Sequence, residues 1–150
     1  MYYICHLQLK IPYRGEVCSS SLRHGCDDSI TDAEIAINGY SVLRHDRNRE
    51  GGGVCEYIRN DIAFNPRKEL QNNCTETIWF DLLLPKSKPI IIGVCYRPPE
   101  DPDFLSHFEC CISKIRSDCE IMIMGDFNVD FFNRTAVYTR TIRTFLICLI

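Results

Sequence analysis

The sequence lacks several features that would define its class at once. None of its ten cysteines belongs to a C-x-x-C pair, which excludes the common zinc and thiol–disulfide motifs. Cys55, Cys95 and Cys119 lie in or beside strand-like apolar runs, where cysteine behaves as a small hydrophobic residue. This use of cysteine indicates a reduced chain, so we expect an intracellular protein of the nucleus or cytoplasm that is not secreted.

No segment has the pattern of a secretion signal or a membrane anchor. Residues 1–12 lack the basic start and long apolar run of a signal peptide. Residues 145–150 are apolar, but a run this short cannot cross a bilayer. We therefore expect no membrane partner.

A general excess of positive charge is also missing. The formal net charge is −3, so a protein of this kind that binds nucleic acid needs a local basic face. Arg44, Arg47, Arg49 and Arg59 form the clearest basic cluster, and such side chains make sequence-independent contacts with phosphates. The alternative is a solvated arginine-rich turn. The glycines at 51–53 are not followed by Lys-Ser/Thr, so they are not a phosphate-binding loop by pattern.

What the chain does have is the composition of one globular domain. Its 150 residues are 45% hydrophobic and 25% charged, which suffices to bury a core. A polar loop is predicted at 65–75 and a second helix at 135–149. Apolar runs predict five strands, at 41–45, 53–59, 76–84, 89–96 and 120–125. Helical spacing of apolar residues predicts a first helix at 104–116, between the last two strands.

The segment EIMIMGDFN at 120–128 is the most informative part of the chain. Its apolar residues predict a buried strand that stops at Gly125. If the chain stays extended, alternation places Asp126 and Asn128 on one side. A carboxylate that accepts a proton and an amide that donates a hydrogen bond are then available to a water and a phosphate. The alternative is an Asx-type turn, in which these side chains bond the neighbouring main chain.

A second strand-like run, KPIIIGVCY at 88–96, ends in YRPP. The two prolines cannot continue a sheet and lead the chain into a loop. Tyr96 and Arg97 therefore lie where a strand leaves the core. Arg97 has the geometry to bind a phosphate with two hydrogen bonds, and Tyr96 to donate another. The alternative is a tyrosine that closes the core and an arginine that extends to solvent.

Together these segments resemble the endonuclease/exonuclease/phosphatase superfamily, and in particular the endonuclease domain of non-LTR (LINE-type) retrotransposons. The resemblance covers residues 28–130. The ordered motifs that carry it are GY at 39–40, RHDR at 44–47, GGGVCEYIR at 51–59, ETIWF at 76–80, YRPP at 96–99 and GDFN at 125–128.

The resemblance implies an α+β fold: a two-sheet α/β sandwich of the deoxyribonuclease I-like type, mostly antiparallel, with flanking helices and the active site at one end. Its members cut phosphoester bonds with a divalent metal, usually Mg²⁺. The retrotransposon branch nicks target DNA so that a reverse transcriptase in the same polyprotein can prime from the cut. DNA and that reverse transcriptase are the partners implied.

The same resemblance assigns roles to individual residues. Tyr96 matches the tyrosine that contacts phosphate, Asp126 the aspartate that handles the proton of the attacking water or leaving group, and Asn128 the asparagine that positions the scissile phosphate. These are the expected catalytic residues. Arg97, Arg44 and Arg47 are the expected substrate-binding residues.

Three parts of the family pattern are missing, so we expect a domain that is truncated at both ends. The first-strand asparagine has no counterpart in residues 1–21, and Arg23-His24-Gly25-Cys26 stands where the metal-binding glutamate belongs. No histidine follows Asp126 to match the C-terminal Ser-Asp-His segment. We therefore assign no metal ligand and expect weak or absent Mg²⁺ binding.

These observations divide the chain and leave two functions open. We expect an unclassified N-terminal segment at 1–26 and an incomplete endonuclease/exonuclease/phosphatase domain at 27–150. One function is that of a fragment of a metal-dependent DNA endonuclease. The other is that of a degenerate, inactive remnant that acts at most as a binding module.

Overall fold

Two four-stranded sheets form the framework of the protein. The structure, a computed structural model, describes the chain in four stretches, which are residues 5–11, 15–22, 30–46 and 53–128. Within them the strand orders are β1-β2-β4-β3 in the first sheet and β5-β6-β7-β8 in the second.

The first sheet is antiparallel throughout the described ladders. It consists of β1 (Cys5–Ile11), β2 (Gly15–Leu22), β3 (Tyr40–Asp46) and β4 (Gly53–Arg59). The β1–β2 hairpin joins the sheet through pairing of β2 with β4. A short helix, α1 (Asp32–Ile35), precedes β3.

The second sheet carries the residues of greatest functional interest. It consists of β5 (Ala63–Pro66), β6 (Glu76–Leu83), β7 (Ile90–Tyr96) and β8 (Glu120–Asp126), with a 3₁₀ turn, η1 (Lys68–Leu70), between β5 and β6. The ladders are antiparallel except that β7 and β8 are parallel. A parallel pair needs a crossover, and here the crossover contains α2 (Phe104–Ser113).

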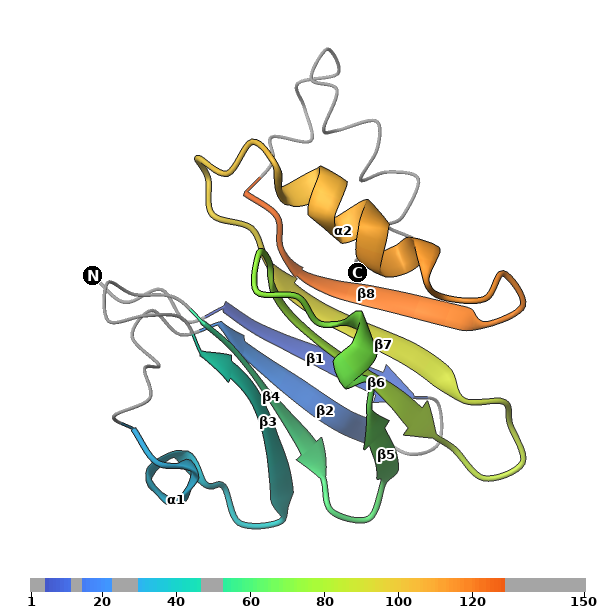
Figure 1. The fold of residues 1–150 in the computed structure, drawn as a ribbon. Coiled ribbons are helices and arrows are strands. Elements are labelled where there is room, and N and C mark those ends of the chain that lie inside the picture. The colour runs from blue at the N-terminus through green and yellow to red at the C-terminus, as the bar shows by residue number, and fades with distance from the viewer. Residues whose placement is uncertain (1–4, 12–14, 23–29, 47–52, 129–150) are drawn as a thin grey trace.

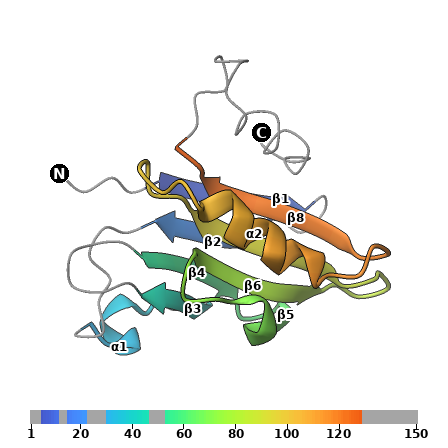
Figure 2. The same cartoon turned by 45° about the horizontal axis from the view of Figure 1, so that its top comes forward.

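The two sheets face each other, and α2 covers the outer face of the second sheet. Figure 1 shows α2 over β8, on the side away from the first sheet, and Figure 2 shows the helix lying across that sheet. The layers are thus sheet, sheet and helix. An antiparallel sheet often leaves one face in water, but here both faces of the second sheet are covered.

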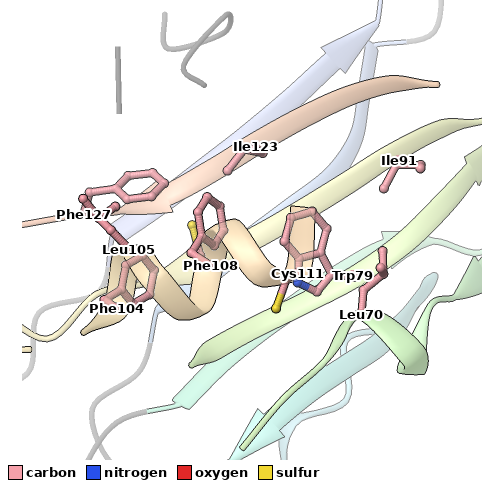
Figure 3. Packing of buried hydrophobic residues seen from close by; sticks show 10 residues of the cluster. Leu70, Trp79, Ile91, Phe104, Leu105, Phe108, Cys111, Ile123 and Phe127 are labelled. Atoms are coloured by element: carbon pink, nitrogen blue, oxygen red, sulfur yellow. The ribbon is translucent and has the colours of Figure 1, made fainter. Parts of the chain in front are cut away.

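Apolar side chains fill both spaces between these layers. The core between the sheets contains Val54 and Ile58 of β4 together with Phe80, Ile92 and Val94 of the second sheet. Under α2 lies an aromatic cluster, drawn in Figure 3, that includes the four rings of Trp79, Phe104, Phe108 and Phe127. Its rings pack at centroid distances of 5.4 Å for Phe104–Phe108 and 5.8 Å for Trp79–Phe108. Burial of such rings supplies the main stabilisation of this layer.

The predicted fold class is confirmed, and most predicted elements have their counterparts. The five predicted strands correspond to β3, β4, β6, β7 and β8, and the predicted first helix corresponds to α2. The helix ends at Ser113 rather than at residue 116. The predicted second helix at 135–149 lies outside the described residues.

Two parts of the sheets were not predicted. Residues 5–22 were left unclassified, yet β1 and β2 are hydrogen-bonded into the first sheet. The expected division at residue 26 itself stays a prediction. The loop expected at 65–75 is shorter, because β5 continues to Pro66. Proline is compatible with a strand at the edge of a sheet, which is where β5 lies.

Two further expectations concern cysteines and membranes. Five cysteines in the described stretches are free thiols: Cys74, Cys95, Cys110, Cys111 and Cys119. Among the helices of the described stretches, none combines the length and apolarity that a membrane crossing requires.

Candidate functional site

Three polar side chains stand in one row at an end of the second sheet. Because β7 and β8 are parallel, both reach the same edge at their carboxyl ends, and Tyr96 pairs with Asp126. The antiparallel neighbour β6 begins at that edge, where Glu76 pairs with Tyr96. Paired residues of a ladder share a face of the sheet. The strands that carry Tyr96 and Asp126 are therefore neighbours in one sheet.

This row belongs to the face that looks toward the first sheet. Tyr96 packs against the core between the sheets, whereas Phe127, one residue beyond the row, packs in the aromatic cluster under α2. The phenol of Tyr96 and the carboxylate of Asp126 therefore stand at one end of the sandwich. That is the place at which the sequence predicted a site.

Gly125 allows β7 and β8 to come this close before the site begins. Its φ is +152°, and a Cβ atom at this position would lie 1.8 Å from the carbonyl oxygen of Cys95. A side chain has no room there. The glycine is thus required by the close approach of two main chains.

The chain turns after Asp126 instead of staying extended. Asn128 has φ +46°, in the left-handed region that asparagine tolerates better than most residues. Its N–H donates to Oδ1 of Asp126 at 2.9 Å, which is the Asx turn weighed as the alternative. The expectation that simple alternation places 126 and 128 on one side is therefore wrong, because alternation requires an extended chain.

The side chain of Asn128 is held at the same end of the sheet in another way. Its Nδ2 donates to the carbonyl oxygen of Arg97 at 2.8 Å. In turn the N–H of Arg97 donates to the carbonyl oxygen of Asp126 at 2.8 Å. These bonds keep the residues after β7 and the residues after β8 together, so Tyr96, Asp126 and Asn128 do lie at one end of the sheet.

Arg97 does not have the exposed guanidinium expected of a phosphate ligand. The residue is only 7% exposed. Its Nη1 lies 3.2 Å from the carbonyl oxygen of Phe127 and 3.3 Å from that of Asn128. Its Nη2 lies 3.1 Å from the carbonyl oxygen of Asp101. The guanidinium is therefore engaged by main-chain carbonyls, and direct contact of Arg97 with substrate stays a prediction.

Arg44 is likewise engaged within the protein. Its guanidinium pairs with Asp46, where Nη2 and Oδ2 are 2.6 Å apart, and with Asp32 at 3.2 Å. The hydrogen bond with Asp46 raises the pKa of Arg44 above its ordinary value. The side chain is 13% exposed. Arg47 lies outside the described residues, so substrate binding by Arg44 and Arg47 stays a prediction.

A cavity of about 160 Å³ opens beside the row. It lies between the end of β3, the start of β6 and the loop that follows β7. Three carboxylates and an imidazole are among its lining residues, which are His45, Asp46, Asn73, Cys74, Thr75, Glu76, Pro98 and Asp101. The size suits a few waters or one small chemical group rather than a whole nucleotide.

Two residues of this cavity were not assigned from the sequence. Glu76 is buried, and its Oε2 accepts the N–H of Gly53 at 2.8 Å. The Nδ1 of His45 is 3.0 Å from the carbonyl oxygen of Thr77, so Nδ1 is the donor, because a carbonyl oxygen only accepts. Both bonds join the first sheet to the second. A signal for Glu76 was present in the sequence, since it is an acid that lies two residues before the apolar run 78–80 of a predicted strand.

The described residues do not form a metal cage. No group of three or more His, Cys, Asp or Glu side chains within the described stretches is placed to hold a metal ion. Asp126 and Glu76 each use a carboxylate oxygen to accept a main-chain N–H. Mg²⁺ demands several oxygen ligands in octahedral geometry, and this donor set does not fit it.

Comparison with known proteins gives a likeness of fold. No protein-family model matches the chain, and no curated protein matches it in sequence. Among solved structures it is similar to the endonuclease domain of TRAS1, a telomere-specific non-LTR retrotransposon, with a TM-score of 0.58 and 12% identity. The match covers 72% of this chain and 51% of that domain.

The chain therefore spans about half of the domain that it matches. At 12% identity the likeness concerns the fold and not the activity. The predicted fold is thus confirmed: the chain is a partial two-sheet α/β sandwich whose fold is similar to that of this solved domain.

Proposed function

We propose that this chain is a fragment of a metal-dependent DNA endonuclease domain of a non-LTR retrotransposon, which nicks target DNA ahead of reverse transcription. The observation that carries the proposal is the convergence of Tyr96, Asp126 and Asn128 at one end of a sandwich. The solved domain with this fold is itself named as a retrotransposon endonuclease. DNA is the proposed substrate, and a reverse transcriptase of the same polyprotein is the proposed partner.

The three residues are proposed to divide the work on one phosphodiester. Tyr96 donates its phenol O–H to a phosphate oxygen. Asp126 has Oδ1 engaged by the N–H of Asn128, and its carboxylate orients or deprotonates a water. Asn128, whose amide is fixed on the carbonyl of Arg97, donates its remaining N–H toward the charge that develops on the phosphate.

Metal dependence is proposed for the whole domain and not for this chain by itself. The donor set of the described residues does not fit Mg²⁺, and the roles proposed above use protein groups alone. We expect weak or absent Mg²⁺ binding by the chain. Isothermal titration calorimetry that gives a sub-millimolar Kd would contradict this expectation, and loss of that affinity in Asp126→Ala would place the ion at the site.

The second candidate function is an inactive remnant that binds DNA without cutting it. It is favoured by the way the site residues are used, because the polar groups of Asp126, Asn128 and Arg97 bond the main chain of the protein itself. A site of this kind keeps its shape without supplying a metal. The two candidates differ in whether the site regains activity when two of the three missing family parts, the metal-binding glutamate and the C-terminal Ser-Asp-His segment, are supplied.

Nicking of supercoiled plasmid distinguishes the endonuclease fragment from the inactive remnant. We expect the unmodified chain with Mg²⁺ to nick no faster than buffer, because loss of one transition-state donor costs roughly 10²–10³-fold and parts that act together leave little residual activity. A second protein carries Arg23→Glu and a family-type C-terminal Ser-Asp-His segment. If the proposal is right, this completed protein nicks DNA.

Further outcomes distinguish nicking by the site from DNA binding without cleavage. Asp126→Ala in the completed protein should abolish nicking while the far-ultraviolet circular dichroism spectrum is retained. A completed protein that folds and binds DNA but never nicks it supports the binding module instead. Robust nicking by the unmodified chain that disappears in Asp126→Ala would show that the site is complete without the added parts.

A further inference from the structure

Arg97 is an unusual residue because it is a cation at 7% exposure. A buried charge costs several kcal/mol unless polar groups surround it. Here carbonyl dipoles do so. Nη1 faces the carbonyl oxygens of Phe127 and Asn128 at 3.2 and 3.3 Å, and Nη2 faces those of Asp101 and Pro99 at 3.1 and 3.5 Å. The side chain thus connects the segment after β8 with the loop after β7.

The main chain of Arg97 is tied to the same segment. Its N–H donates to the carbonyl oxygen of Asp126, and its carbonyl oxygen accepts from Nδ2 of Asn128, each at 2.8 Å. Arg97 therefore holds residues 126–128 from both its backbone and its side chain. Any residue other than proline could make the main-chain contacts, but the guanidinium contacts require arginine.

The conformation of Asn128 explains why such a hold is needed. A left-handed φ of +46° is uncommon for a non-glycine residue, and the surroundings must enforce it. The carbonyl oxygen of Asn128 points at the guanidinium, while its N–H points back at Asp126. The contact with Arg97 favours the turn over an extended continuation of β8.

We propose that Arg97 is a positioning residue that holds Asn128, and through it Asp126, in the geometry of the site, and that it does not bind phosphate. What the positioned residues do rests on the function proposed above. The fork of the guanidinium is essential to this role, because it reaches carbonyls on two sides at once. A lysine has the charge but not the fork.

The first test is nuclear magnetic resonance of the unmodified chain, so that it does not depend on a variant that folds. A guanidinium held by several carbonyls rotates slowly, and we expect separate Nη proton signals for Arg97. Arg116 is the internal control, because its side chain is 81% exposed and pairs with Asp118 at the surface. Averaged, rapidly exchanging signals for Arg97 like those of Arg116 would overturn the proposal.

The second test uses Arg97→Lys and Arg97→Gln, with Arg116→Lys and Arg116→Gln as matched controls. We expect at least a tenfold faster amide exchange at Asn128 and a shifted Asn128 side-chain NH₂ signal in both Arg97 variants. Amides of Ile78 and Phe80 in β6 should be unchanged, and so should all of these signals in the Arg116 variants. Unchanged Asn128 signals in folded Arg97 variants would contradict the proposal.

The third test distinguishes positioning from phosphate binding. Each phosphate contact that is lost reduces the slope of log affinity against log salt by about one. We expect the slope for a short DNA duplex to be the same in the original chain and in Arg97→Gln, and a slope reduced by about one would overturn the proposal.

In the completed protein, Arg97→Lys should lower kcat roughly 10²-fold with little change in KM. If the completed protein is inert, the proposed function fails, while the resonance tests still decide the role of Arg97.

Discussion

The middle of the β7–β8 pair and its carboxyl end are held by different forces. In the middle, residues such as Ile92 and Ile123 lie in apolar clusters on the two faces of the sheet. At the end, directional bonds from Arg97, Asn128 and Asp126 determine the geometry. Apolar packing tolerates replacement by side chains of similar volume, whereas a site held by hydrogen bonds depends on individual donors and acceptors.

Phe127 connects these two regions. Its ring packs edge-on against Phe104 and Phe108 in the aromatic cluster, with centroids 6.2 and 6.1 Å away. Its carbonyl oxygen accepts from Arg97. The residue that separates Asp126 from Asn128 in the sequence is therefore an anchor of the site in the core. The core therefore fixes where this site lies, and hydrogen bonds fix its geometry.

The largest expected effect comes from breaking the aromatic cluster. Phe108→Ala should lower the free energy of unfolding by about 3–5 kcal/mol, because a fully buried ring is replaced by a cavity. Urea denaturation followed by fluorescence of the single tryptophan measures the loss. Phe64→Ala is the matched control, since Phe64 lies on the edge strand β5 and is only partly buried, and it should cost clearly less. Equal losses would contradict the assignment of the main core.

The next largest loss of stability is expected at Gly125, where the apolar middle of the β7–β8 pair meets its hydrogen-bonded carboxyl end. Gly125→Ala should cost about 2–4 kcal/mol, because a Cβ would collide with the carbonyl of Cys95 and strain the backbone as well. Gly39→Ala is the control: Gly39 has φ +86° with open space around it, so strain alone should cost about 1–2 kcal/mol. Thermal unfolding of both variants measures the difference, and similar losses would show that β7 and β8 are less close than described.

The apolar strands and the hydrogen-bonded site also differ in how well the sequence predicts them. The apolar runs of β6, β7 and β8 were readable because burial of both faces leaves a nearly continuous hydrophobic pattern. β2 was not, because Gly15–Leu22 contains three consecutive serines and little apolar alternation. Pairing with β4 overrides that weak local preference. β1 was overlooked although its sequence CHLQLKI alternates between apolar and polar residues, as a strand with one buried face does.

Within the site, sequence reasoning located residues better than it described their contacts. The strand ends placed Tyr96 and Asp126 together correctly. Some partners of Arg97 and Arg44 could not be deduced, because Asn128 and Asp32 are distant from them in the sequence. Other partners are near in the sequence, such as Asp46 for Arg44 and Asp101 for Arg97, but no sequence pattern shows that the side chains turn toward them. His45 was missed for the same reason, since its partner Thr77 lies on the opposite sheet.

A smaller effect separates stability from function at the site. Asp126→Ala removes the acceptor for the Asn128 N–H and should cost about 1 kcal/mol, far less than a core substitution. Asp126→Asn keeps an oxygen that can accept this bond, so we expect almost no loss of stability. In the completed protein both variants should lose nicking. A loss of stability as large as that of Phe108→Ala would show that Asp126 is part of the structural core.

The smallest perturbation is chemical labelling, which changes no residue and tests whether the strand end opens locally. Burial, with a lesser contribution from the nearby charge of Asp126, raises the pKa of the Cys95 thiol well above its ordinary value. Since the thiolate is the reactive form, raised pKa and burial together make Cys95 slow to alkylate in native protein at pH 8. Exposed Cys110 and its buried neighbour Cys111 provide a reference pair on α2. Iodoacetamide labelling followed by peptide mass mapping should place Cys95 with Cys111, whereas labelling of Cys95 at the rate of Cys110 would show that the end of β7 separates from β8 without global unfolding.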